Sequence, residues 1–201
     1  MKGVAVIGAG RIGKIHAANA AAHPRLSLKY VVDPYGDAAA LAQEHGARTA
    51  DVEQVWADPD VAGVVIASST DTHLDYTLAA VRAGKHVFCE KPLDQDVNRA
   101  RRALKELEAG GPKVLLGFNR RFDPNFASLR ARLSRGEIGV LETLHIISHD
   151  PAPPPPSYIK TSGGIFKDMS IHDFDMARFL LGEEIESVFA SASVLVDPEI
   201  G

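Results

Sequence analysis

The chain has 201 residues, enough for one or two domains with a substantial hydrophobic core. It is 45% hydrophobic and 24% charged, which is ordinary for a soluble globular protein. A net charge of −4 and the absence of a Lys/Arg stripe argue against nucleic acid and anionic membranes as partners. A single cysteine, Cys89, excludes an internal disulfide framework and a cysteine-rich zinc site. We therefore expect a cytoplasmic protein, and no apolar run approaches the length of a membrane span.

The beginning of the chain carries a nucleotide-binding pattern. Val4–Ile7 is an uninterrupted apolar run, typical of a strand buried on both faces, and Gly-Ala-Gly-Arg-Ile-Gly follows it. An Ala-rich helix is expected over Ile15–Ala22, and a second strand, Leu28–Val32, ends at Asp33. Glycines spaced in this way between a strand and a helix, with an acid about 20 residues further on, indicate dinucleotide binding.

Each residue of this pattern has a physical role. Gly8 permits the tight turn, Gly10 lets the backbone approach a pyrophosphate, and Gly13 lets the helix pack closely on the strand. The phosphates would lie at the helix N-terminus, where free N–H groups and the helix dipole favour an anion. Asp33 is expected to bind the adenosine ribose hydroxyls and to repel a 2′-phosphate, which favours NAD over NADP. The alternative is a glycine turn that is merely structural.

Helices and strands continue to alternate up to about residue 118. The expected further strands are Val61–Ala67, Lys85–Cys89 and Val114–Phe118, and the expected helices are Ala38–His45, Val52–Ala57, one ending at Ala83, and Asp94–Ala109. This alternation predicts an α/β domain over residues 1–120, with a Rossmann-type, doubly wound parallel sheet.

Polar residues follow two of these strands. Ser68–Thr70 lie at the carboxyl end of the third strand, where parallel sheets bind ligands, although Asp71 or Thr72 could equally be a plain helix N-cap. His73, in the first helical turn, is interpreted as a packing or capping residue rather than a catalyst. Lys91 stands in Glu-Lys-Pro at the next strand end, where its ammonium group could polarise a substrate hydroxyl. The alternative is a surface lysine beside a turn proline.

The pattern changes after Gly136. Val140–Ser148 and Ser187–Val196 alternate between apolar and polar residues, which predicts strands of an open, mostly antiparallel sheet. We interpret Pro151–Pro156 as a stiff loop between sheet and helix, with a polyproline II ligand as the alternative. We therefore expect a second, α+β domain over residues 121–201. Two strands are marginal alone, so the sheet looks truncated and the chain is expected to be a fragment or to take strands from elsewhere.

A predicted helix between these strands carries candidate catalytic groups. Asp168, His172 and Asp175 stand at i, i+4 and i+7 and would share one helix face. A carboxylate one turn before a histidine can hold the imidazole in one tautomer and stabilise its protonated form, as a base requires. One alternative is a solvated face with a chance Asp/His pair. Another is a metal site of two histidines and one carboxylate, formed by His149, Asp168 and His172.

The sequence resembles the Gfo/Idh/MocA family of sugar and polyol dehydrogenases over essentially its whole length. The resemblance rests on GAGRIG near the start, the Glu-Lys-Pro motif and the Asp-x-x-x-His helix. The stretches GFNRRFDP, SHDPAPPPPSYIK and SGGIFKDMSIHDFDMARFL are similar, more specifically, to the inositol dehydrogenases of the family. The resemblance implies NAD-dependent oxidation of the axial hydroxyl of myo-inositol to the 2-keto sugar, in a homotetramer.

The resemblance also implies roles for individual residues. His172 would take the hydroxyl proton, Asp168 would orient it, and Lys91 would hold the reacting oxygen. The sequence does not determine whether the Lys91–Pro92 bond is cis, a geometry essentially restricted to proline. The residues expected to bind the polyol are Lys91, Arg121, His149, Asp168, His172 and Asp175. The residues expected to bind NAD are Gly8, Gly10, Arg11, Ile12, Gly13, Asp33, Ser68, Ser69, Thr70, His73, Glu90 and Lys91. No metal is expected.

Family members continue considerably further than this chain. If the natural polypeptide ended at Gly201, cofactor binding would be expected to survive and turnover to be weak or lost. Two alternatives to the inositol reaction stay open: a dehydrogenase of another inositol isomer or a pyranose sugar, and a non-catalytic NAD(H)-binding sensor. Arg121 could equally be a surface charge.

Overall fold

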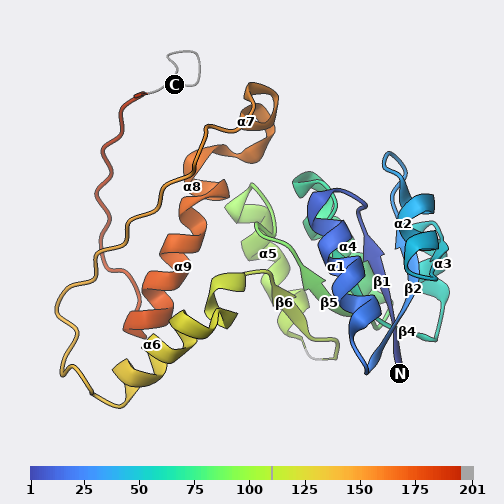
Figure 1. The fold of residues 1–201 in the computed structure, drawn as a ribbon, viewed down its shortest axis with the longest axis horizontal. Coiled ribbons are helices and arrows are strands. Elements are labelled where there is room, and N and C mark those ends of the chain that lie inside the picture. Colours follow the sequence, from blue (N-terminus) through green and yellow to red (C-terminus); the bar gives the residue numbers. More distant parts are fainter. Residues whose placement is uncertain (110, 196–201) are drawn as a thin grey trace. The chain divides into compact units, whose positions relative to one another are not determined.

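The structure is a computed structural model that describes residues 1–109 and 111–195, without the side chains of residues 157, 160 and 161. The chain divides into two compact units (Figure 1). Unit 1 is Met1–Gly117, and unit 2 begins at Phe118. The predicted domain boundary at residue 120 lies close to this division, and each unit is described here by itself.

Unit 1 is built on a parallel sheet, as predicted, but the sheet has six strands where five were expected, in the order β3-β2-β1-β4-β5-β6 (Figure 1). The strands are β1 (Lys2–Ile7), β2 (Leu26–Val32), β3 (Arg48–Thr49), β4 (Val61–Ile66), β5 (His86–Cys89) and β6 (Val114–Leu116). Chain order reverses between β1 and β4. At such a reversal the loops that follow the two strands diverge, which opens a crevice at the carboxyl edge of the sheet.

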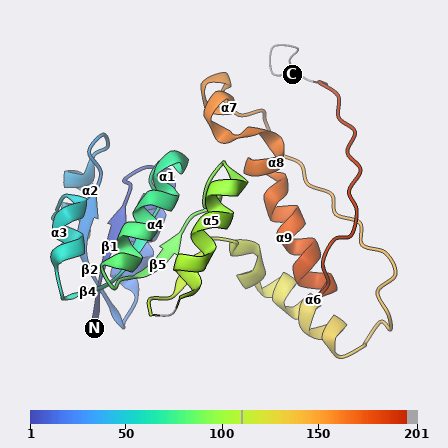
Figure 2. The same cartoon turned by 180° about the vertical axis from the view of Figure 1, so that it is seen from behind.

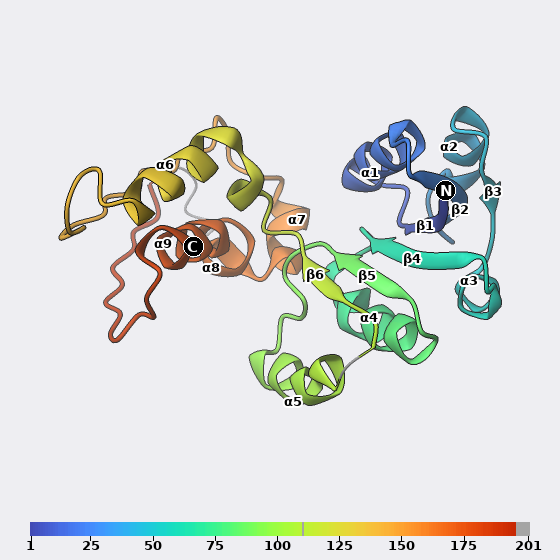
Figure 3. The same cartoon turned by 90° about the horizontal axis from the view of Figure 1, so that it is seen from below.

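Helices cover both faces of this sheet. The helices of unit 1 are α1 (Arg11–Ala22), α2 (Ala38–Glu44), α3 (Val52–Ala57), a 3₁₀ turn η1 (Thr70–Thr72), α4 (His73–Arg82) and α5 (Val97–Glu108). Figures 2 and 3 show α1 and α2 on one face and α3, α4 and α5 on the other. Successive side chains of β1 point to opposite faces. Val4 and Val6 therefore pack with α1 and α2, while Ala5 and Ile7 pack with the other three helices.

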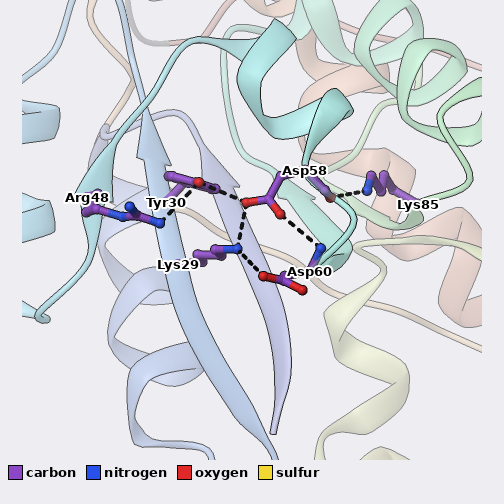
Figure 4. A network of polar contacts seen from close by, with 6 residues as sticks. All are labelled: Lys29, Tyr30, Arg48, Asp58, Asp60 and Lys85. Carbon is purple, nitrogen blue, oxygen red and sulfur yellow. Dashed lines mark hydrogen bonds and ion pairs between the residues drawn. The ribbon is translucent and has the colours of Figure 1, made fainter.

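A polar network joins β2 to the loop before β4 (Figure 4). The Asp58 carboxylate lies 2.6 Å from the Lys29 ammonium nitrogen and accepts hydrogen bonds from the Tyr30 hydroxyl at 2.8 Å and the Asp60 backbone N–H at 2.9 Å. The buried Lys85 donates to the carbonyl oxygen of Asp58. These bonds stabilise the charged carboxylate, and they lower the pKa of Asp58 from its ordinary 3.8 to about 2, with Lys29 as the main cause.

Because the folded pKa of Asp58 lies below its unfolded value, its contribution to stability is complete above pH 3.8 and is lost as pH falls toward 2. We expect Asp58→Asn to melt at a lower temperature at neutral pH, and the difference from wild type to shrink across that acid window. Asp60→Asn is the matched control, since the Asp60 side chain is 80% exposed and such ion pairs contribute little. Thermal melts followed by circular dichroism measure both variants. Equal melting temperatures of Asp58→Asn and Asp60→Asn would contradict the stabilising role of the Asp58 carboxylate.

Unit 2 is helical in the part that the structure describes. Its elements are a 3₁₀ turn η2 (Asn119–Phe122), α6 (Pro124–Ser134), α7 (Pro156–Ser162), α8 (Gly164–Asp168) and α9 (Ser170–Leu181). Helix α6 begins at a strong signal that the sequence reading passed over: the Asp123 carboxylate caps the N–H groups of Asn125 and Phe126, and Pro124 occupies the first turn. Helices α6 and α9 contact each other.

The two strands predicted for unit 2 are wrong as far as the described residues show. Segments 140–148 and 187–195 are irregular, and residue 196 lies outside the described residues. Leu144 and Ile146, which the alternation places on one side, are half-buried, whereas every residue of 187–195 is exposed. A strand also needs a hydrogen-bonded neighbour, and neither segment is paired as a strand in the described chain. Val140, Val188 and Phe189 are accordingly 82%, 80% and 92% exposed.

The proline-rich stretch connects these irregular residues to α7. Pro155 has the extended backbone of polyproline II (φ −58°, ψ 141°), and Pro156 begins the helix. This agrees with the predicted stiff loop leading into a helix, although its other end joins no sheet in the described residues. No helix within the described ranges combines the length and the apolar character that crossing a membrane requires.

Candidate cofactor and substrate sites

Three glycines, Gly8, Gly10 and Gly13, lie at the turn between β1 and α1, and we call them the glycine cradle. Gly8 has a positive φ of 105°, and a Cβ on it would lie 2.3 Å from the carbonyl oxygen of Ala67. A Cβ on Gly13 would lie 1.9 Å from the carbonyl oxygen of Gly8, so only glycine lets α1 approach the turn. Nothing lies within 4 Å of a Cβ on Gly10, which leaves open space at the helix N-terminus. These positions fit a pyrophosphate.

The N-terminus of α1 is suited to an anion. Helix α1 starts at Arg11, has no acidic residue in its first turn, and receives no side-chain cap from Gly10. Its first N–H groups and its dipole therefore face the open space beside Gly10 without a competing carboxylate. Arg11 is exposed and Ile12 is half-buried.

Gly10 and Gly13 have different surroundings, so a substitution at each position can distinguish an effect on cofactor binding from an effect on folding. Gly10→Ala adds a methyl group to open space, so we expect an unchanged melting temperature and NADH affinity reduced about tenfold or more, because the methyl occupies the place of the phosphate. Gly13→Ala forces backbone apart and is expected to cost about 1–3 kcal/mol of folding free energy. Denaturant unfolding and NADH titration check both. An equal loss of stability in the two variants would contradict the claim that Gly10 borders the phosphate site while Gly13 is needed for packing.

Asp33 lies at the end of β2, where the ribose of a dinucleotide is expected. Its Oδ2 accepts the backbone N–H of Ala9 at 2.7 Å, and its Oδ1 accepts those of Tyr35 and Gly36, each at 2.8 Å. Burial alone would raise the pKa of Asp33, but the three N–H donors outweigh it and lower the pKa. Asp33 is therefore charged at neutral pH, and Oδ2 keeps an acceptor position for a ribose hydroxyl.

The residues after β4 occupy the same edge of the sheet. The hydroxyls of Ser68 and Thr72 are 2.7 Å apart, and the Thr72 hydroxyl donates to the carbonyl oxygen of Ser69. Ser69 is exposed, and Thr70 begins η1. Thr72 is the residue before α4, yet its side chain makes no capping bond. The Ser68–Thr70 prediction as cofactor contacts stays a prediction.

His73 is 2% exposed and bridges two backbone segments. Its Nδ1 lies 2.8 Å from the carbonyl oxygen of Pro92, and its Nε2 lies 3.1 Å from that of Ser68. Both ring nitrogens thus contact the protein. This favours the packing interpretation of His73 over a direct hydrogen bond to the cofactor.

Glu90, Lys91 and Pro92 follow β5 directly. The backbone N–H of Glu90 donates to the carbonyl oxygen of Ile66 at 2.9 Å, which ties the segment to β4. The Glu90 carboxylate lies 2.7 Å from Nε2 of His16 on α1, a contact that the sequence reading did not find. Lys91 is half-buried, and the Lys91–Pro92 bond is cis, as the family resemblance implies.

In unit 2 the predicted catalytic helix is broken. Asp168 is the last residue of α8 and His172 lies in the first turn of α9, with Met169 between them at φ −103°. The first bond of the new helix is a short-range one, from the N–H of His172 to the carbonyl oxygen of Met169 at 3.1 Å. The expectation of one continuous face for all three residues is therefore wrong. His172 and Asp175, three positions apart in α9, do share a side.

Asp168 and His172 have neighbours that the sequence reading did not single out. The Tyr158 hydroxyl donates to Oδ1 of Asp168 at 2.9 Å, and the edge of the His172 ring faces Phe118 with 6.4 Å between centroids. Both groups are half-buried, as a reacting acid or base in a binding site would be. A tyrosine beside a carboxylate and an aromatic ring beside a histidine restrict how each side chain can turn.

Two of the predicted substrate-binding residues bind each other. Arg121 donates two hydrogen bonds to the carboxylate of Asp175, at 2.8 and 2.6 Å, and its guanidinium group lies over the Phe179 ring. Hydrogen bonding to Asp175 raises the pKa of Arg121, so the guanidinium group stays charged. Asp175 is 5% exposed, whereas the Arg121 side chain is 37% exposed. Arg121 therefore has further N–H donors available for a ligand, and Asp175 positions it.

A second ion pair lies beside this one. Arg120 bonds to Asp173, which also accepts the Ser148 hydroxyl at 2.8 Å, so η2, the 140–150 segment and α9 are joined in unit 2. His149, the next residue, is exposed in an irregular segment. In the described chain no three His, Cys, Asp or Glu side chains are grouped so as to hold a metal ion. The alternative metal site of His149, Asp168 and His172 is thus not formed.

The parallel sheet, the glycine cradle and Asp33 together define a Rossmann-fold, NAD-binding domain. Comparison with known proteins agrees. Residues 2–118 match the family described as "Oxidoreductase family, NAD-binding Rossmann fold", and residues 126–201 match "GFO/IDH/MocA C-terminal domain". The chain belongs to the Gfo/Idh/MocA family of NAD-dependent oxidoreductases.

Within this family, the chain is similar to several inositol dehydrogenases. Inositol 2-dehydrogenase of Rhizobium meliloti is 49% identical over 197 residues, which is 98% of this chain and 60% of the relative. A crystal structure of a myo-inositol dehydrogenase from Corynebacterium glutamicum superimposes with a TM-score of 0.84 at 50% identity, covering 89% of this chain and 54% of that one. A scyllo-inositol dehydrogenase from Lactobacillus casei, with bound NAD(H) and scyllo-inositol, gives 0.81 at 32% identity, covering 92% and 57%. The chain spans about 60% of the length of its curated relatives.

Proposed function

We propose that the complete protein oxidises a secondary hydroxyl of a cyclic polyol, and that myo-inositol is converted to 2-keto-myo-inositol (scyllo-inosose). The observation that carries the proposal is the 49% identity to an inositol 2-dehydrogenase over 98% of this chain. That stretch includes both Lys91 and the Asp168/His172 pair. A cyclic polyol presents only hydroxyl groups, so its recognition needs several directional polar side chains. The polar set of unit 2 supports such recognition.

In this proposal the protein positions the substrate and accepts a proton. NAD, when bound, supplies the acceptor for the hydride that leaves the hydroxyl-bearing carbon. His172 takes the hydroxyl proton as the C–H electron pair departs and the carbonyl bond forms. Asp168, held by Tyr158, stabilises the imidazolium that results. The Lys91 ammonium group donates to the reacting oxygen and stabilises its developing negative charge. Arg121, fixed by Asp175, and His149 bind the other ring hydroxyls.

We also propose that the protein works as a homotetramer in the cytoplasm, as the family resemblance and the single cysteine suggest. Cys89 is fully buried, and burial raises the pKa of its thiol to about 12. It is therefore a poor nucleophile at neutral pH, which is consistent with a structural role at the end of β5, directly before Glu90 and Lys91.

A scan of NADH formation with inositol isomers and pyranose sugars, using the complete protein, tests the proposal. The expected result is the highest kcat/KM with myo-inositol. A higher value with scyllo-inositol would favour the second candidate substrate, which the Lactobacillus casei relative was crystallised with. NADH binding without turnover of any polyol or sugar would favour the non-catalytic sensor and overturn the enzyme.

A further inference from the structure

Two histidines outside the proposed chemistry hold the residues on either side of Lys91. His16, on α1, has its Nε2 2.7 Å from Oε1 of Glu90, the residue before Lys91. His73, on α4, has its Nδ1 2.8 Å from the carbonyl oxygen of Pro92, the residue after Lys91. All four residues belong to unit 1. The glycine motif and the strand pattern account for neither histidine.

Further contacts hold each histidine ring in place. The His16 ring packs edge-on against Phe88, with 5.0 Å between ring centroids, and both partners in the His16–Glu90 pair are about four-fifths covered. His73 is 2% exposed, and its second nitrogen faces the carbonyl oxygen of Ser68 at the end of β4. A carbonyl oxygen can only accept, so a neutral His73 ring donates to one of its two carbonyls and a protonated ring to both.

The backbone leading into this segment is fixed as well. The Glu90 N–H donates to the carbonyl oxygen of Ile66 on β4, and the Gly117 N–H donates to that of Cys89. The histidines add what the sheet does not provide, namely a side-chain anchor for Glu90 and a backbone anchor for Pro92. A lysine side chain is long and flexible. Its ammonium group can be aimed reproducibly only if the backbone on both sides is held.

We propose that His16 and His73 are positioning residues that fix the Glu90–Pro92 segment and thereby aim the Lys91 ammonium group at the reacting hydroxyl. The proposal rests on the proposed function of Lys91. His73 also contacts the carbonyl oxygen of Ser68, two residues after β4, and so links the loop expected to contact the cofactor to the loop that carries Lys91. A displacement of about 1 Å in such a group can cost about 100-fold in rate.

The test is a set of double-mutant cycles in the complete protein, with kcat for polyol oxidation measured at saturating NAD. We expect His16→Leu and His73→Leu to lower kcat about tenfold or more, and His16→Gln and His73→Gln, which keep an N–H donor, to recover most of the loss. In a Lys91→Met background the same Leu substitutions should cost less than about twofold, because nothing is left to aim. His86→Leu is the matched control: His86 is exposed at the other end of β5, its Nδ1 accepts the backbone N–H of Lys113 rather than a group of the Glu90–Pro92 segment, and its loss should leave kcat unchanged.

Equal losses from the Leu substitutions in the wild-type and Lys91→Met backgrounds would overturn the positioning role, as would wild-type kcat in both Leu variants. If His73→Leu does not fold, the His16→Leu cycle alone decides the positioning role, because the His16 side chain is 20% exposed and contacts the Glu90 side of the segment. Failure of the proposed function looks different. An unchanged kcat in Lys91→Met, or no turnover by the wild-type protein, would remove the role of Lys91 and the positioning role with it.

Discussion

Replacing His172 with alanine is expected to lower kcat for polyol oxidation by about 10²–10⁴-fold, the usual contribution of a positioned general base. NADH affinity should stay within about threefold of wild type, because the proposed role of His172 is to take the substrate proton and it is not among the residues expected to bind NAD. Steady-state kinetics of the complete protein, combined with NADH titration by fluorescence, separates the two effects.

His145→Ala is the matched control, since His145 is exposed in the same unit and has no proposed role. A pH profile adds a second readout: the acid limb of kcat, where the base becomes protonated, should disappear in His172→Ala. Turnover close to wild type, or an unchanged acid limb, would remove His172 as the base.

The second large effect is expected at Asp33. Asp33→Ser removes a charged acceptor, and hydrogen bonds to charged groups are worth about 1.5–3 kcal/mol, so NADH affinity should fall by about 10- to 100-fold. NADPH affinity should rise, because the carboxylate no longer repels the 2′-phosphate. Asp33→Arg should shift the preference further, since a guanidinium group pairs with phosphate. Titration of the full chain with both nucleotides measures the ratio.

Asp37→Ser provides a control with the same change of charge in the same loop. Asp37 caps α2 by accepting the N–H of Ala40 at 3.0 Å, and serine is also a good cap, so neither folding nor cofactor choice should change. Asp33 also holds three backbone N–H groups, so melting curves must accompany the titrations. An unchanged NADH/NADPH ratio in a folded Asp33→Arg variant would contradict the ribose assignment.

Unit 1 could be predicted from the sequence because its signals are local and mutually consistent. A strand buried on both faces appears as a continuous apolar run, and Val4–Ile7 and Val61–Ala67 are such runs. The glycine spacing then specifies the turn, since Gly8 and Gly13 meet backbone at distances that no other residue allows. The two-residue strand β3 was missed because so short a segment has no period to detect.

Unit 2 could be predicted much less well. Alternation over 140–148 marks a face, but a pairing partner is a long-range property that alternation does not contain. The break at Met169 could not be anticipated from residue types, because methionine is a good helix former. Tertiary contacts also determine which groups a side chain binds. The sequence predicts Arg121 as a substrate-binding residue, and in the structure two of its N–H groups donate to Asp175.

The contacts of His16 and Tyr158 show the same limit. Each of these residues lies outside the motifs but contacts a residue inside one: His16 contacts Glu90, and Tyr158 contacts Asp168. The His16–Glu90 contact spans 74 positions in sequence. The His16 contact follows from the place of its ring beside Phe88 of β5, and the Tyr158 contact follows from the packing of α7 against α8. A capping residue such as Asp123, in contrast, could have been found, because an aspartate directly before Pro124 is a strong local helix-start signal.

The most direct test of the central claim is the transfer of deuterium from myo-inositol labelled at C2, with the complete protein and NAD. If the protein is a polyol dehydrogenase acting at that carbon, mass spectrometry should find one deuterium in the NADH that forms, together with unlabelled scyllo-inosose. NADH without deuterium would show that another carbon is oxidised, and bound NAD that is never reduced would contradict the dehydrogenase itself.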